Sequence, residues 1–138
     1  MNPFPNATIS GTAIVLAPGH FNPDRAKTAF GLVRGSERFQ VLAVIDSKTA
    51  GQDAGDIVDS KIRDIPVFGS VNQALEKLEL RPQYAVIGIT TPGGILPDYL
   101  MLEIEQALEV GLDIVNGLHQ PLSETVSYTH LTLPTIFR

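Results

Sequence analysis

Short apolar segments, separated by stretches with a different hydrophobic period, constrain the fold of this chain more than any other feature. Four of them are rich in β-branched residues and apolar at most positions, which is typical of strands buried on both faces of a sheet. They span residues 12–17, 39–45, 84–89 and 112–115. A shorter segment, residues 65–68, predicts a fifth strand, and Pro66 within it indicates a sheet edge or the start of a strand.

The intervening segments repeat their apolar residues about every 3.6 positions, which predicts amphipathic helices. The first helix ends at Gly35, and Ser70 with Gln73 forms a capping-box pattern that opens the second. Pro97 suits the first turn of the third, and Gly111 occupies the position of a left-handed C-cap. The three apolar stripes comprise Ala26, Ala29, Phe30 and Val33; Val71, Ala74, Leu75 and Leu78; and Leu100, Met101, Ile104, Ala107 and Leu108.

This alternation of strands and helices, with a loop expected between the second and third strands, produces right-handed crossovers and a parallel sheet. We therefore predict an α/β fold, a Rossmann-like three-layer sandwich whose sheet of about five strands has the order 3-2-1-4-5. Residues 1–125 form one domain of ordinary size.

Charge and composition exclude several classes of protein. The net charge of -5 and the scattered basic residues argue against nucleic-acid binding, which needs clustered Lys and Arg. The chain has no cysteine, and no apolar run approaches the roughly 20 residues that span a bilayer. We expect a cytoplasmic protein that binds a small molecule and neither nucleic acid nor membrane, with homo-oligomer formation left open.

The last thirteen residues, 126–138, differ abruptly in composition from the rest, with no charge before Arg138 and many β-branched and hydroxyl residues. Residues 126–135 resemble the in-frame translation of a sequencing adapter. We interpret 126–138 as an artefact rather than native sequence, with an edge strand as the alternative.

Ligands of such sheets bind beyond the carboxyl ends of the strands. This rule selects the loops 18–25, 46–55, 90–96 and 116–121. The first leads into a helix whose N-terminal N–H groups can receive an anion, with Arg25 and Lys27 adding positive charge. Only Gly19 falls in the turn, so the dinucleotide fingerprint of three spaced glycines is absent, which weakens an NAD interpretation.

The second and third of these loops carry further candidates for ligand binding. Asp46 ends a strand, where a carboxylate often accepts hydrogen bonds from a ribose, although a turn or cap role is equally compatible. Lys48 is placed to meet a phosphate. The small residues of the 90–94 loop let a ligand approach the main chain closely. The candidates for ligand binding in this loop are Thr90, Thr91, Gly93 and Gly94.

Candidates for catalysis are few. His20 follows the first strand and His119 the last, so both are general-base candidates, with a structural hydrogen-bonding role as the alternative. His20 also belongs to the candidate ligand-binding set. Asp53 and Asp56 are interpreted as helix caps rather than metal ligands, and no metal site is predicted.

Five segments together resemble a known family. They are GTAIVLAPGHF, the stretch from KTAFGLVRG to GQDAG, IPVFGSVNQALE, YAVIGITTPGGILP and ALEVGLDIVNGLH, and the likeness covers residues 11–123. This is a family of two-domain bacterial and archaeal proteins of unknown function, some members of which are D-glutamate N-acetyltransferases. The resemblance implies a Rossmann-like domain followed by a P-loop domain, and the P-loop glycine-lysine motif is missing from this sequence.

A second likeness, of IPVFGSVNQALE, the glycine loop after YAVIGI and EQALEVGLDIVNGLH, is to the CoA-binding domain of succinyl-CoA synthetase. It implies that Lys48 and the 90–94 loop face the ligand, and it favours acetyl-CoA, CoA or ATP over NAD.

Three hypotheses follow. The first is the ligand-holding part of an N-acyltransferase or ATP-linked enzyme that needs the P-loop domain for catalysis. The second is an NAD-dependent oxidoreductase or epimerase-like domain, and the third is a non-catalytic nucleotide or CoA sensor.

Overall fold

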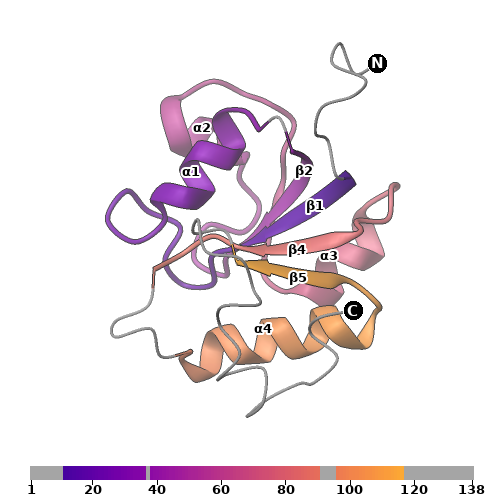
Figure 1. Cartoon of the computed structure of the whole chain (residues 1–138). Helices are drawn as coiled ribbons and strands as arrows, with labels where there is room; N and C mark the ends of the chain where they lie inside the picture. The colour runs from indigo at the N-terminus through magenta and orange to yellow at the C-terminus, as the bar shows by residue number, and fades with distance from the viewer. Residues whose placement is uncertain (1–10, 37, 91–95, 117–138) are drawn as a thin grey trace.

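The chain forms a five-stranded parallel sheet with the order β3-β2-β1-β4-β5. The computed structural model describes residues 11–36, 38–90 and 96–116. In chain order the strands are β1 (Gly11–Leu16), β2 (Phe39–Ile45), β3 (Val67–Phe68), β4 (Tyr84–Ile87) and β5 (Asp113–Asn116). The predicted strand order is confirmed, and Figure 1 shows the sheet at the centre of the molecule.

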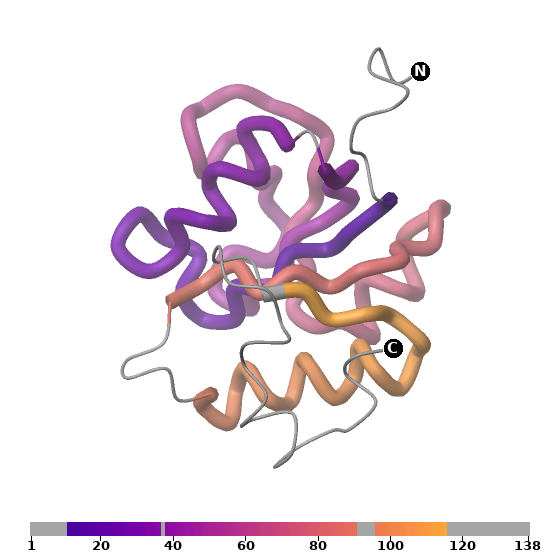
Figure 2. Tube along the Cα trace, in the orientation of Figure 1, coloured from indigo at the N-terminus to yellow at the C-terminus, as the bar shows by residue number. Residues whose placement is uncertain are grey.

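Helices cover both faces of this sheet, which gives the predicted three layers. Helices α1 (Lys27–Arg34) and α2 (Ala54–Asp59) pack together on one face. Helices α3 (Val71–Lys77) and α4 (Asp98–Glu109) pack together on the other. The tube in Figure 2 shows α1 and α4 on opposite sides of the strands. No helix within the described ranges is long and apolar enough to cross a membrane.

The core is centred on β1, as expected for a strand with neighbours on both sides. Ile14, Val15 and Leu16 are fully buried between the two helical layers. The face of α1 that packs on the sheet carries Ala29, where Gly88 allows a close approach: the Ala29 N–H donates to the Gly88 carbonyl oxygen at 3.1 Å. Removing this apolar surface from water provides most of the driving force for folding.

Ser70 caps helix α3 as the capping-box pattern predicts, while the return bond of Gln73 reaches the residue before the cap. The Gln73 N–H donates to Ser70 Oγ at 3.1 Å, and Gln73 Oε1 accepts from the Gly69 N–H at 2.8 Å. The helix therefore starts directly after β3, and its first residue, Val71, is buried. Gly111 has a φ of +91° just beyond α4, in agreement with its predicted capping position.

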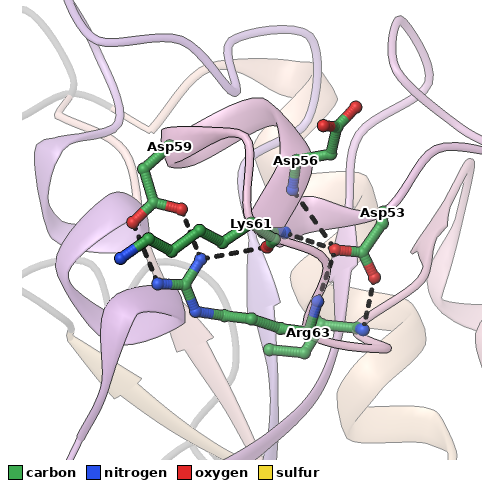
Figure 3. A network of polar contacts seen from close by, with 7 residues as sticks. Asp53, Asp56, Asp59, Lys61 and Arg63 are labelled. Carbon is green, nitrogen blue, oxygen red and sulfur yellow. Dashed lines mark hydrogen bonds and ion pairs between the residues drawn. The ribbon is translucent and has the colours of Figure 1, made fainter.

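The segment between β2 and β3 corrects the sequence prediction, because it contains the helix α2 where a loop was expected. Its N-cap is Asp53, whose Oδ2 accepts from the N–H groups of Gly55, Asp56 and Arg63 and whose Oδ1 accepts from Ile65. Figure 3 shows this carboxylate within a network of polar contacts that includes an ion pair between Arg63 and Asp59. The capping role predicted for Asp53 is confirmed.

Some strand bounds also differ from the prediction. β3 is only two residues long rather than four, and β4 ends at Ile87 rather than at residue 89. Pro66 precedes β3 and has no N–H to donate, which limits how far this edge strand can extend. β4 ends where Gly88 turns its carbonyl oxygen toward α1.

Candidate functional site

A pocket of about 380 Å³ lies at the carboxyl ends of three strands. Pro18, Gly19 and His20 follow β1, Ser47 and Lys48 follow β2, and Gly69 follows β3. The first turns of α4 form the remaining wall with Tyr99, Leu102 and Glu103. This is the edge of the sheet at which ligands of doubly wound folds bind. The structure thus brings together three of the predicted ligand-binding residues: Gly19, His20 and Lys48.

The Asp46 carboxylate holds the two loops of this pocket together. Its Oδ1 accepts from the Gly19 N–H at 2.7 Å and from the Lys48 N–H at 3.3 Å, and its Oδ2 accepts from Thr49 Oγ1 at 2.6 Å. Asp46 is only 1% exposed. Of the two roles that the sequence allowed, this geometry matches that of a turn residue, and the contact with a ribose remains a prediction.

Gly19 is required by the conformation of its loop. Its φ is +77°, a region that residues with a Cβ rarely adopt, although no heavy atom lies within 4 Å of the place where a Cβ would be. The backbone there turns its N–H toward Asp46. A side chain at this position would therefore strain the backbone of the loop.

The surroundings of His20 favour the neutral form of its imidazole. Burial lowers the pKa of His20 below its usual value, and the positive charges of Arg25 and Lys48 lower it further, while Asp46 acts in the opposite direction. The imidazole packs against the ring of Tyr99 with the ring centroids 5.2 Å apart. A neutral imidazole can accept a hydrogen bond or a proton from a ligand.

Glu103 is a pocket residue that the sequence analysis did not single out. It lies on α4 and is 7% exposed, and its Oε1 accepts from the Val71 N–H at 2.9 Å. Burial raises the pKa of this carboxyl, although the bond from Val71 acts in the opposite direction. A signal was present in the sequence, because Glu103 interrupts the apolar stripe formed by Leu100, Ile104 and Ala107.

Other predicted residues lie away from this pocket. Lys27 is exposed at the start of α1 and does not line it. The Arg25 guanidinium donates to the Thr90 carbonyl oxygen from Nε at 3.1 Å and from Nη2 at 2.9 Å, and the Thr90 N–H donates back to the Arg25 carbonyl oxygen. Arg25 therefore ties the loop after β1 to the end of β4. Thr91, Gly93, Gly94 and His119 lie outside the described residues, as do residues 126–138.

A second, larger pocket of about 530 Å³ lies at the opposite ends of the strands. Its lining includes the start of β2 and the segments that precede β3 and β4. Ligands of parallel α/β sheets bind at the carboxyl ends, so this pocket is not the candidate site. Within the described part of the chain, no cluster of three or more His, Asp or Glu side chains could hold a metal ion.

The sheet order and the position of the first pocket define a Rossmann-like α/β domain. Residues 47–135 match the model of a family described as a domain of unknown function, DUF1611_N, a Rossmann-like domain. The chain belongs to the DUF1611 family and represents its N-terminal Rossmann-like domain.

A solved structure supports this assignment. The crystal structure of a DUF1611 family protein from Anabaena variabilis shares 36% sequence identity with the chain, with a TM-score of 0.70. The match covers 91% of this chain and 35% of that protein, so the chain spans about a third of its relative's length. No curated protein matches the chain.

Proposed function

We propose that this domain binds an adenine-containing ligand, CoA, acetyl-CoA or ATP, in the pocket at the carboxyl ends of β1, β2 and β3. In a longer protein it would serve as the ligand-holding part of an N-acyltransferase-like or ATP-linked enzyme. The observation that carries the proposal is the convergence of Gly19, His20 and Lys48, from two separate loops, on one pocket.

The size and charge of the pocket support such a ligand. Ligand pockets generally measure about 300–1,000 Å³, and this pocket lies near the lower limit. It therefore suits one part of a cofactor, such as a nucleoside with its first phosphates, rather than a whole CoA molecule. Lys48 is exposed and carries the positive charge that a phosphate requires.

The state of Asp46 argues against the alternative of an NAD-dependent oxidoreductase. In NAD-binding domains a carboxylate at the end of the second strand accepts hydrogen bonds from the ribose. Here the Asp46 carboxylate already accepts from Gly19, Lys48 and Thr49. Asp46 is also only 1% exposed, so a ribose could reach it only if these loops moved, and we favour CoA or ATP over NAD.

Calorimetric titration of the 138-residue chain with acetyl-CoA, ATP and NADH tests the proposal. We expect acetyl-CoA or ATP to bind with a dissociation constant on the order of 0.1–1 mM, because ~1 mM corresponds to only about -4.1 kcal/mol, which a small open site can provide. An acetyl-transfer assay with D-glutamate should show no turnover, since catalysis requires reacting groups to be aligned and water to be excluded.

A pair of variants links any binding to the pocket. Lys48→Gln removes the positive charge and should weaken binding by about two- to fivefold, as expected for an exposed ion pair of up to about 1 kcal/mol. Lys61→Gln is the matched control, because Lys61 is also exposed but does not line this pocket. Absence of binding of all three ligands at millimolar concentration, or equal weakening by both variants, would refute the proposal.

A further inference from the structure

Glu103 is a charged residue on the buried, otherwise apolar face of α4. The other buried residues of α4 are Leu100, Ile104 and Ala107, all apolar. The Glu103 side chain lies among them and is only 7% exposed. A carboxyl group in such surroundings is costly unless hydrogen-bond donors compensate it. Burial accordingly raises the pKa of Glu103.

This carboxyl group has acceptor capacity to spare. An ionised carboxylate has about four acceptor positions on its two oxygens. Among the residues that the structure describes, the only donor to Glu103 is the Val71 N–H, which binds Oε1 at 2.9 Å. Glu103 is also part of the wall of the pocket that contains His20 and Lys48. No buried side-chain oxygen in the described part of the chain lacks a partner, so the second oxygen of Glu103 is accessible to solvent and can accept from a ligand in this pocket.

The surroundings of Glu103 indicate what kind of group it would meet. Tyr99 and Leu102, on the same helix, line the pocket and are 40% and 54% exposed. Together they offer an apolar surface against which a planar ring can pack. Lys48, which follows β2, contributes a positive charge to the same pocket.

We propose that Glu103 determines specificity for the base of the ligand, by accepting a hydrogen bond from the exocyclic amine of adenine. The base packs against Tyr99 and Leu102, and its phosphates interact with Lys48. This inference rests on the proposed function, because it assigns the base end of the adenine-containing ligand. Adenine presents an N–H donor at its 6-position. Hypoxanthine presents a carbonyl oxygen there, which Glu103 would repel.

The comparison of ATP with inosine triphosphate tests this contact. The amine at the 6-position of adenine is a carbonyl oxygen in hypoxanthine, and the neighbouring N1 changes from an acceptor to an N–H donor, so the expected loss applies to a base whose 6-position faces Glu103. NMR titration of the 138-residue chain should show binding of ATP that is about tenfold tighter than binding of inosine triphosphate. A hydrogen bond to a charged group contributes on this scale, and a buried acceptor that faces another acceptor loses it.

Glu103→Gln provides a stronger test, because it should reverse the preference. The Val71 N–H is a donor and needs an acceptor, so the amide oxygen of the substituted side chain should take the place of Glu103 Oε1. The amide NH₂ group should then face the pocket. This NH₂ group is a donor, which suits the carbonyl of hypoxanthine and not the amine of adenine. Glu105→Gln, an exposed position on the same helix that does not line the pocket, should retain the preference of the original chain.

The outcomes separate this inference from the proposed function. If no adenine-containing ligand binds, the proposed function fails and the inference fails with it. If ATP binds but inosine triphosphate binds equally well, or if folded Glu103→Gln still prefers ATP, the inference alone is wrong. Thermal unfolding checks that the variant is folded. Should it not fold, the ratio of the two affinities in the original chain decides the question, since a ratio near one refutes the role of Glu103.

Discussion

Substitution of Gly88 by alanine tests the packing of α1 on the sheet, which shapes the edge where the pocket lies. A Cβ at this position would lie 2.6 Å from Val15 Cγ1 and 2.9 Å from Ala29 Cβ. It would also lie 3.3 Å from Ala29 Cα, so the backbone of α1 obstructs it as well as side chains. Val15 and Ala29 are both fully buried, so the added methyl group would have to be accommodated within the core.

The expected cost follows from this geometry. Extra atoms in a well-packed core generally destabilise a protein by about 1–3 kcal/mol. Relief of the Gly88→Ala contacts requires α1 to shift, which would strain the bond from the Ala29 N–H to the Gly88 carbonyl oxygen. We therefore expect a loss of about 2–3 kcal/mol in the free energy of unfolding, within the upper part of that range.

Gly31→Ala is the matched control, and it should have the opposite sign. Gly31 lies inside α1, and no heavy atom lies within 4 Å of the position that its Cβ would occupy. Alanine is favoured over glycine inside helices by about 0.5–1 kcal/mol, so this variant should be more stable than the original chain.

Urea denaturation followed by circular dichroism measures both changes. The midpoint should fall for Gly88→Ala and rise for Gly31→Ala, with an unchanged dependence on urea concentration. Midpoints that move in the same direction, or a change of less than about 0.5 kcal/mol for Gly88→Ala, which is typical of surface positions, would show that α1 does not approach β4 this closely.

Three further predictions concern ionisable groups. Burial raises the pKa of Asp53, but hydrogen bonds from four backbone N–H donors outweigh it and hold this pKa below its ordinary value. The Asp53 carboxylate therefore stabilises the fold at neutral pH, and this contribution is lost as the pH falls through the lowered pKa. Asn keeps one acceptor oxygen but places an NH₂ group against the N–H donors of the other, so in urea denaturation Asp53→Asn should cost about 1–2 kcal/mol at pH 7 and less near pH 2. NMR titration should give His20 a pKa below 6.5, and Lys48→Gln should raise it by removing a positive charge, while burial keeps it below 6.5. The raised pKa of Glu103 means that the folded state binds its proton more tightly, so this residue's contribution to stability falls as the pH rises above 4.5. Urea midpoints should therefore show Glu103→Gln gaining stability relative to the original chain between pH 4 and pH 7, and a constant difference would contradict this.

The sheet and its strand order could be predicted because the signals are local. Each buried strand is a continuous apolar run, and each helix that was predicted carries its own apolar stripe or capping residues. Helix α2 has a recognisable capping residue in Asp53 but no apolar stripe, since it is six residues long and contains Gly55. It is stabilised by Asp53, two of whose donors, Arg63 and Ile65, lie ten and twelve residues further along the chain. Contacts of this kind are visible only in the folded structure.

The sequence predicted one part of the candidate site, the loops that follow the strands, but not the wall formed by α4. The rule that ligands bind beyond the carboxyl ends of strands led to Gly19, His20 and Lys48, because it depends only on where strands end. It could not show that Arg25, which the sequence presents as a free cation, is engaged by the Thr90 carbonyl oxygen. It also could not find Glu103, which comes from the opposite wall and from the middle of a helix.

Hydrogen-bond counts separate the two buried carboxylates at this edge of the sheet. Asp46 and Glu103 are the buried charged residues among those that the structure describes. Asp46 accepts from three donors of its own and a neighbouring loop, so its acceptor capacity is used in holding the pocket walls together. Glu103 accepts from a single donor within the described residues and lines the pocket. The second oxygen of Glu103 is accessible to solvent, because no buried side-chain oxygen in the described residues lacks a partner. A ligand N–H can replace water at this oxygen with a charge-assisted hydrogen bond, which is stronger than one between neutral groups. Asp46 is therefore suited to maintaining the shape of the site, and Glu103 to selecting what the site binds.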